Sequence, residues 1–231
     1  MALNITLAIL VVVFAYIIGS ISFSVIFSKI FTGKDVRDSG SGNAGATNVL
    51  RTAGKLPAIL TFVCDALKGF VACFAGKMVF SYISVLPNTS EWFTPMYGAY
   101  FCCIAVMLGH IFPIFFGFKG GKAVACSVGT FAVCCPIAIV LGLLVFALGV
   151  VATKIVSLSS VLATITVVST AILYAVFGPE SGGNAFFLTV DYNIVPTVIC
   201  AAVAGAIVIL KHKSNIVRLL NGTEKKISSK K

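Results

Sequence analysis

The sequence predicts an all-α integral membrane protein with seven transmembrane helices. Of its 231 residues, 59% are hydrophobic and only 10% are charged, whereas soluble domains carry about 25% charged residues. The mean hydropathy is +1.08. Charge-free runs are long, and a helix needs roughly 20 such residues to cross about 30 Å of hydrocarbon. These runs cover residues 2–28, 92–118, 123–153, 155–179 and 192–210. We therefore expect a single polytopic membrane domain over residues 1–231.

The first two spans are expected at about 3–27 and 57–80. The first lacks the basic segment of a secretory signal and is too long for one, so it is predicted to be retained. The second carries Asp65, Lys68 and Lys77, and a charge near a helix centre costs roughly 2.5–3.5 kcal/mol. Asp65 and Lys68 are three residues apart and can pair on one helical face, either as a structural ion pair or to brace an active site. Lys77 is expected to extend toward the membrane surface.

The middle of the chain is predicted to contain a short helical hairpin. A third span is expected at 95–117, and 31 uncharged residues then separate Lys122 from Lys154. Both lysines should lie on one side of the membrane, so an even number of crossings is needed. A 31-residue helix measures only about 46 Å, less than two crossings of about 30 Å. We expect two short helices that break near Cys135-Pro136. The last four spans are therefore predicted at 123–135, 137–153, 156–177 and 193–210.

The placement of charge predicts an external N-terminus and a cytoplasmic C-terminus. Residues 81–97 and 179–193 contain no lysine or arginine, and they hold the acidic residues Glu91, Glu180 and Asp191. Basic loops stay in the cytoplasm under the positive-inside rule. The loops that carry most of the lysines and arginines are therefore expected on the cytoplasmic side.

Eight cysteines all fall inside the predicted spans, and none forms a C-x-x-C pair or neighbours a histidine at ligand spacing. This pattern favours small packing residues over a zinc or redox site. No metal ligands are predicted.

The most informative polar segment covers residues 35–51, with the core Gly40-Ser41-Gly42-Asn43-Ala-Gly45-Ala-Thr47-Asn48 and then Arg51. Such a loop can direct backbone N–H groups and a guanidinium at a phosphate, because glycine permits tight turns and close approach. Its Gly-x-Gly-x-x-Gly pattern lacks the strand–helix context of a dinucleotide site. No phosphate loop of the ATP-binding type is present either.

Two more polar segments fall on the same predicted side of the membrane. Lys119-Gly120-Gly121-Lys122 precedes a hydrophobic run, so it is either a basic anchor with a flexible turn or an anion site at a helix start. His212, Asn215 and Arg218 would share one helical face. They are either part of a basic tail that holds anionic lipid, or they orient a hydroxyl and accept its proton. We expect the three segments to converge.

Together these segments resemble the bacterial acyl-phosphate:glycerol-3-phosphate acyltransferase family (PlsY type). The motifs occur in the family's order and spacing. They are Gly19-Ser20, the loop 35–51, Asp65-x-x-Lys68-Gly69, Gly109-His110-x-Phe-Pro113 through Lys122, and His212-x-x-Asn215-Ile216-x-Arg218-Leu219-x-x-Gly222-x-Glu224. The family usually continues the lysine motif as Gly-Val-Ala-Thr, whereas this chain has Ala123-Val-Ala-Cys126.

The resemblance implies a seven-helix enzyme of the bacterial inner membrane with its active site facing the cytoplasm. It would transfer a fatty acyl group from acyl phosphate to the 1-hydroxyl of sn-glycerol 3-phosphate, giving lysophosphatidic acid and phosphate. The donor is already activated, so positioning and electrostatic stabilisation can suffice without an acyl-enzyme, cofactor or metal. The expected partners are the two substrates and membrane lipid, with no nucleic acid. No oligomeric state is predicted.

The resemblance also implies roles for individual residues. Ser41, Arg51 and Lys122 would form the catalytic phosphate-lined centre, and His212 and Asn215 would contact glycerol 3-phosphate. The hydroxyl proton would go to the substrate phosphate, with His212 as the alternative acceptor. Ser157 and Ser160 either hold a phosphate or are ordinary helix-start serines. The substrate-binding residues are expected to be Gly42, Asn43, Thr47, Asn48, Gly120, Gly121, Ser157 and Ser160.

Other classes of membrane protein fit less well. An alcohol phosphotransferase would need clustered aspartates for a divalent metal, but the seven acidic residues are scattered. A transporter of phosphorylated solutes would show inverted repeats and helices broken near mid-membrane, and no repeat is visible. An acyltransferase with an H-x-x-x-x-D motif is excluded, because the fifth residue after His110 is Phe115 and after His212 is Val217.

Overall fold

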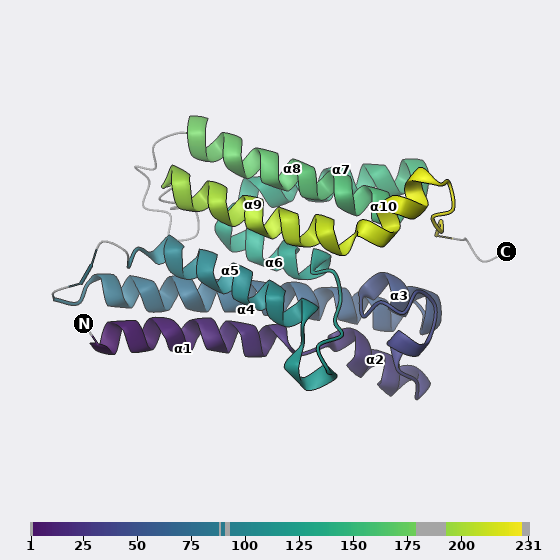
Figure 1. Ribbon diagram of the computed structural model, residues 1–231, viewed down its shortest axis with the longest axis horizontal. Coiled ribbons are helices and arrows are strands. Elements are labelled where there is room, and N and C mark those ends of the chain that lie inside the picture. Colours follow the sequence, from purple (N-terminus) through teal and green to yellow (C-terminus); the bar gives the residue numbers. More distant parts are fainter. Residues whose placement is uncertain (1, 88, 91–92, 179–192, 228–231) are drawn as a thin grey trace. The chain divides into compact units, whose positions relative to one another are not determined.

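The computed structural model describes residues 2–87, 89–90, 93–178 and 193–227, and these residues form helices and loops without a strand. The prediction of an all-helical chain is confirmed over this part. The chain divides into two compact units, residues 1–134 and 135–231 (Figure 1). Unit 1 contains α1 (Ala2–Gly19), α2 (Phe23–Thr32), η1 (Val36–Asp38), α3 (Ala46–Thr52), α4 (Lys55–Ser84), α5 (Pro95–Ile111), η2 (Ile114–Phe116) and α6 (Val124–Cys134). Unit 2 contains α7 (Pro136–Thr153), α8 (Val156–Phe177), α9 (Ile194–Lys211) and α10 (Lys213–Leu220).

Six helical segments within the described residues are long and apolar enough to cross a membrane. They are Ala2–Thr32, Lys55–Ser84, Pro95–Phe116, Pro136–Thr153, Val156–Phe177 and Ile194–Lys211. The remaining predicted span, 123–135, corresponds to the short helix α6, which has 11 residues. The seven-helix count therefore stays a prediction. The acidic residues Glu91, Glu180 and Asp191, on which the predicted orientation rests, lie outside the described residues.

The first span is a broken helix, where the sequence predicts a continuous one. Helix α1 ends at Gly19 and α2 begins at Phe23. The carbonyl of Ile21, inside the break, accepts a hydrogen bond from Lys68 Nζ at 2.6 Å. A side-chain donor from α4 thus satisfies a backbone group that the break leaves outside the helical ladder.

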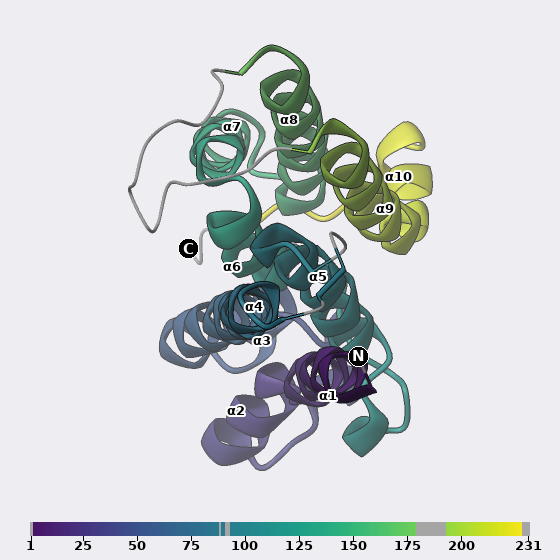
Figure 2. The ribbon, with the colours of Figure 1, turned by 90° about the vertical axis from the view of Figure 1, so that its left-hand side faces the viewer.

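Unit 1 is built around α4. Helices α1, α5 and α6 all contact α4, and Figure 2 shows α1, α4 and α5 side by side when viewed end-on. Helix α6 packs closely because Gly69 and Gly129 leave no side chain between the helices: a Cβ on Gly69 would lie 2.3 Å from the Cys126 carbonyl. Small residues commonly permit such close helix packing in membranes. The packing places the start of α6, just after Lys122, against the middle of α4.

The helix boundary after Lys122 falls where the sequence predicts, at Cys135-Pro136. Helix α6 ends at Cys134 and α7 begins at Pro136, the first helical position, where the missing proline N–H costs nothing. In unit 2, α8 contacts α7 and α9. Helices α9 and α10 are separated only by His212, so the polar face that contains Asn215 and Arg218 belongs to a short separate helix.

Candidate functional site

An internal ion pair organises the first part of the segment 35–45, which we call the serine loop. The Asp35 carboxylate accepts hydrogen bonds from the Arg37 backbone N–H, from Arg37 Nε at 3.0 Å and from Arg37 Nη2 at 2.9 Å. The hydrogen bonds from the Arg37 side chain hold the pKa of the Asp35 carboxyl below its usual range, although burial opposes the shift. The same pairing raises the pKa of the Arg37 guanidinium. The pair therefore stays ionised and fixes the short helix η1.

Asn48 holds the rest of the serine loop from inside. Its Nδ2 donates to the carbonyls of Val36 at 2.8 Å and Ser39 at 3.0 Å, and its Oδ1 accepts from the Ser41 N–H at 2.9 Å. The residue is only 1% exposed. Gly40 has a φ of +67°, and a Cβ there would lie 2.2 Å from Asn48 Oδ1. The sequence predicts that Asn48 binds substrate. Since both of its amide hydrogens are used within the loop, the structure instead supports a role for Asn48 in shaping the loop.

The other predicted residues of this segment are more accessible. Ser41 and Gly42 are exposed, and Asn43 and Thr47 are half-buried. Thr47 and Arg51 are four residues apart on α3, so they lie on the same helical face, and Arg51 is exposed. Their side chains can therefore meet a ligand from solution or from the membrane surface.

The segment 119–122, which we call the lysine loop, folds back on the end of α5. Gly121 N–H donates to the His110 carbonyl and Gly120 N–H to the Ile111 carbonyl, each at 3.1 Å. Gly42 N–H, in the serine loop, likewise donates to Ser39 O at 3.1 Å. The prediction that the Gly42, Gly120 and Gly121 N–H groups bind phosphate therefore meets a physical objection, because the loops themselves use these donors. Lys122 is half-buried and directly precedes the turn into α6.

Ala123 occupies the position where the resembled family usually has glycine. It is fully buried and has a φ of +62°, in the left-handed region that costs an L residue roughly 1–2 kcal/mol. The turn into α6 thus keeps the backbone conformation of a glycine despite the substitution.

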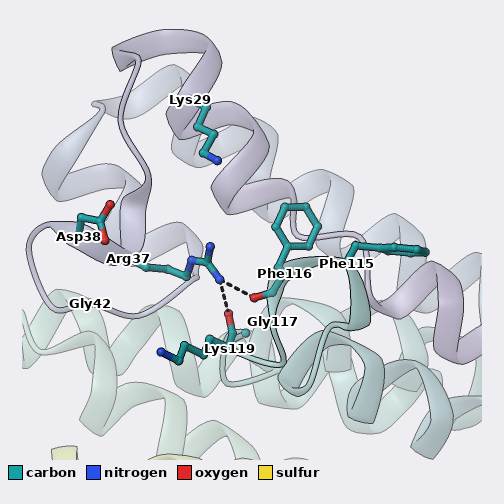
Figure 3. Close-up of a pocket in the computed structure, with 9 residues that line it drawn as sticks. Lys29, Arg37, Asp38, Gly42, Phe115, Phe116, Gly117 and Lys119 are labelled. Atoms are coloured by element: carbon teal, nitrogen blue, oxygen red, sulfur yellow. Dashed lines mark hydrogen bonds between the residues drawn. The ribbon is translucent and has the colours of Figure 1, made fainter.

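The two loops contact each other inside unit 1. Arg37 Nη1 donates to the Phe116 carbonyl at 2.6 Å and to the Lys119 carbonyl at 3.3 Å (Figure 3). Gly121 of the lysine loop also packs against the serine loop, because a Cβ there would be 2.5 Å from the Ala44 carbonyl. Sequence reasoning missed this role of Arg37, although the arginine stands two residues after an aspartate in a loop rich in glycine.

A pocket of about 680 Å³ lies where the loops meet. Three cations and one carboxylate line it together with aromatic rings, so it combines a positive polar side with an apolar side. Its lining residues are Lys29, Arg37, Asp38, Gly42, Phe115, Phe116, Gly117, Lys119 and Gly120. Phe115 is largely exposed and Lys119 extends from the opposite loop (Figure 3). Such a pocket suits an amphiphile with an anionic group.

In unit 2, the predicted residues gather around a carboxylate that sequence reasoning did not single out. Glu224 accepts hydrogen bonds from Asn215 Nδ2 at 2.6 Å, Arg218 Nε at 2.6 Å and Ser157 Oγ at 2.8 Å. The Ile227 N–H also donates to the Lys154 carbonyl at 2.7 Å. Glu224 thus ties the C-terminal segment to α10 and to the start of α8. The only sequence signal for it was its place in the resembled motif.

The remaining residues of unit 2 have local partners. His212 is 3% exposed, and its Nδ1 lies 2.8 Å from the Val208 carbonyl. A carbonyl only accepts, so Nδ1 is the nitrogen that carries the proton in this contact. Ser160 Oγ donates to Val156 O within its own helix at 2.9 Å, as an ordinary helix serine does. Ser157, by contrast, contributes to the Glu224 contacts.

Glu224 gives the protein a predicted sensitivity to acid. Burial raises the pKa of its carboxyl, but the hydrogen bonds from Ser157, Asn215 and Arg218 outweigh burial and lower the pKa below its ordinary value of 4.5. Because the pKa is depressed, the ionised Glu224 stabilises the folded protein above pH 4.5, and this contribution to the free energy of unfolding is lost as the pH falls through the folded-state pKa.

We expect Glu224→Gln to reduce the free energy of unfolding at pH 7 and to flatten its decline below pH 4.5. Thermal unfolding in detergent across pH 3–7 measures both effects. Asp38 is exposed, so Asp38→Asn is a suitable control for a lost carboxylate. Identical pH profiles for wild type and Glu224→Gln would contradict the assignment.

One group of described residues has metal-ligating atoms close together. The Sγ atoms of Cys73, Cys103 and Cys134 lie within 4.8 Å of one another and are buried between α4, α5 and α6. Three sulfur donors form a set that soft metal ions favour. The sequence predicts no metal, and that expectation stays a prediction.

The comparisons with known proteins point in one direction. A family model described as glycerol-3-phosphate acyltransferase matches residues 9–222. Glycerol-3-phosphate acyltransferase 2 of Bacillus anthracis is 37% identical over 219 residues, which cover 95% of this chain and 98% of that protein. The glycerol-3-phosphate acyltransferase of Halalkalibacterium halodurans is 39% identical over 222 residues, 96% of each chain.

Solved structures agree with these sequence matches. The crystal structure of PlsY (YgiH), an integral membrane glycerol 3-phosphate acyltransferase, in its glycerol 3-phosphate form, matches with a TM-score of 0.77 and 35% identity over 96% of both chains. Its lysophosphatidic acid form matches with a TM-score of 0.73 and 34% identity over 96% of this chain and 95% of that one.

Proposed function

The chain belongs to the glycerol-3-phosphate acyltransferase family, and from this premise we propose that it acylates the 1-hydroxyl of sn-glycerol 3-phosphate with acyl phosphate as donor. The products are lysophosphatidic acid and inorganic phosphate, and the reaction begins phospholipid synthesis. The observation that carries the proposal is the extent of the family match. Residues 9–222 include the serine loop, the lysine loop and the His212–Arg218 segment.

In the proposed reaction, the hydroxyl oxygen attacks the acyl carbon and a new ester C–O bond forms. The bond between the acyl carbon and the phosphate oxygen breaks, and phosphate leaves with the electron pair. The hydroxyl proton passes to the departing phosphate. A mixed anhydride is already activated, so the enzyme's task is to align the two substrates and to stabilise developing negative charge.

We assign the donor phosphate to residues of unit 1. Ser41, Thr47 and Arg51 are accessible in and after the serine loop, and Lys122 stands at the start of α6. Guanidinium and ammonium groups are the side chains that bind phosphate oxygens most strongly. The Asn43 side chain is half-buried beside Ser41 and Gly42, and we include it in the binding set. Asn48, Gly120 and Gly121 act by shaping the loops, since their donors are already used.

We assign glycerol 3-phosphate to His212 and Asn215 of unit 2. Ser157 is included because it and Asn215 both donate hydrogen bonds to Glu224. We assign His212 to the substrate hydroxyl by its place in the family's motif. We infer that the substrate phosphate takes the proton and that His212 only positions the hydroxyl. That the residues of both units serve one reaction follows from the family assignment.

We further propose that the chain crosses the inner membrane seven times, with the short helix α6 as the additional crossing and the reaction on the cytoplasmic side. The lysine-rich loops and tail support this orientation under the positive-inside rule. Lys77 is the exception, since it is basic but lies inside a span. Lys226→Cys should react with an impermeant maleimide only in inverted vesicles, and Ser90→Cys only in intact cells. The reverse pattern would contradict the orientation.

The donor is tested with purified protein in detergent and labelled glycerol 3-phosphate. We expect lysophosphatidic acid to form with acyl phosphate and not with an acyl thioester, at a rate that a metal chelator leaves unchanged. Product formation with the thioester alone, or loss of activity in chelator, would contradict the proposed donor or mechanism.

A further inference from the structure

Three ionisable side chains meet in the interior of unit 1. Lys68 Nζ lies 2.8 Å from Asp65 Oδ1, and His110 Nδ1 lies 3.5 Å from the same oxygen. All three residues are buried, with exposures of 1%, 4% and 7% for Asp65, Lys68 and His110. The predicted pairing of Asp65 with Lys68 is confirmed, and His110 on α5 joins it from a distant part of the sequence. We call these residues the ionic network.

The lysine of the network reaches the chain that leads into the serine loop. Lys68 Nζ donates to the Ile21 carbonyl in the break between α1 and α2 at 2.6 Å. The same ammonium lies 5.6 Å from the centre of the Phe23 ring, the first residue of α2. Lys68 thus fixes the N-terminal end of α2, the helix whose other end leads into the serine loop.

The histidine of the network contacts the lysine loop. The His110 carbonyl accepts the Gly121 N–H at 3.1 Å. The ring packs against the same residue, because a Cβ on Gly121 would lie 2.3 Å from His110 Nε2 and 2.5 Å from the Ala44 carbonyl. Gly121 is therefore held between the His110 ring and the serine loop, one residue before Lys122.

The contact of Lys68 with Asp65 is an ion pair more than it is a well-formed hydrogen bond. Neither Asp65 Oδ1 nor His110 Nδ1 has a hydrogen-bond partner of good geometry within the described residues, despite the short approach of Lys68. A buried ion pair of this kind adds little net stability over an apolar replacement. A charge inside a membrane helix is also costly, so such residues commonly serve a function.

We propose that Asp65, Lys68 and His110 are positioning residues that hold the serine loop and the lysine loop in register for acyl transfer. The inference rests on the proposed function. The network contacts the lysine loop at Gly121, and at Ile21 it contacts the start of the segment that leads through α2 into the serine loop, while no atom of it needs to touch a substrate. A displacement of about 1 Å in a reacting geometry can cost on the order of 100-fold in rate.

The decisive experiment compares single variants with a charge-balanced pair. Asp65→Asn and Lys68→Met each leave one buried charge without its partner, so both should unfold at lower temperature in detergent. The double variant Asp65→Asn/Lys68→Met removes both charges, so its Tm should exceed that of either single variant, although the loss of the donor to the Ile21 carbonyl keeps it below wild type. Its kcat should nevertheless remain about 100-fold below wild type, with little change in KM for glycerol 3-phosphate.

A double variant that regains both its Tm and its kcat would overturn the proposal, because the network would then serve stability alone. His110→Gln provides a second measurement if the double variant does not fold. This variant keeps a neutral polar side chain beside Gly121, and we expect a normal Tm with kcat reduced about tenfold. A folded His110→Gln enzyme with wild-type kcat would also contradict the proposal.

Lys77→Met is the matched control. Lys77 is a second buried lysine of α4, nine residues beyond Lys68 and hence about 13.5 Å along the helix axis. We expect this variant to lower the Tm without lowering the kcat of the folded protein. The wild-type assay separates the two hypotheses. If wild type does not acylate glycerol 3-phosphate, the proposed function fails. If wild type and the folded network variants acylate it at equal rates, only the positioning role of the ionic network is rejected.

Discussion

Ser41→Ala and Lys122→Ala are each expected to lower kcat by about 100- to 1,000-fold, the effect of removing one preorganised donor to a developing anion. The fold should survive both changes. Ser41 is exposed, and its contact with Asn48 uses the backbone N–H, which alanine retains. Lys122 is only half-buried. Steady-state kinetics with acyl phosphate and glycerol 3-phosphate, combined with thermal unfolding in detergent, measure the two effects separately.

Lys55→Ala is the matched control for a lost lysine, because Lys55 is exposed at the first position of α4 and has no assigned role. Its kcat should equal that of wild type. Near-normal turnover in both Ser41→Ala and Lys122→Ala would remove these residues from the proposed site, whatever the activity of the wild-type protein.

Asn48→Asp is expected to lower the free energy of unfolding by about 2–6 kcal/mol and to reduce kcat strongly in the folded fraction. Aspartate has nearly the same shape, but it cannot donate to the Val36 and Ser39 carbonyls. Each buried acceptor left without a donor costs about 1–3 kcal/mol. The loop that holds Ser41 would then lose its internal brace, and kcat should fall on the order of 100-fold.

Chemical denaturation at fixed detergent concentration measures the stability change. Asn221→Asp, at an exposed position in unit 2, serves as the control for the same chemical substitution. A stable Asn48→Asp protein with reduced affinity for substrate would instead support the direct substrate contact that the sequence predicts.

Local features of the sequence located most of the helices. The predicted spans 95–117 and 156–177 agree closely with Pro95–Phe116 and Val156–Phe177, because charges and turn residues bound each apolar run. The break at Cys135-Pro136 was also predictable, since proline cannot continue a helix. The break at residues 20–22 was not, because serine and isoleucine do not end a helix by themselves and the compensating donor, Lys68, comes from another helix.

The sequence predicted which segments form the candidate site, but not which of their hydrogen-bond donors are available to a ligand. Glycines and amides in the serine and lysine loops indicated anion binding, yet Asn48, Gly42, Gly120 and Gly121 use their N–H donors within the protein. The sequence offers Arg37 and Glu224 only as members of motifs, and the structure shows each of them joining several segments.

By itself, the sequence determined the membrane class, the limits of most spans, the Asp65–Lys68 pair and the polar segments that carry the chemistry. These features depend on the lengths of apolar runs and on spacings of three or four residues, which act within a single helix. Only the tertiary structure decided which polar groups form hydrogen bonds within the protein and which remain accessible. That division depends on hydrogen bonds between distant residues, such as Arg37 with the Phe116 carbonyl, and such contacts form only when the helices pack.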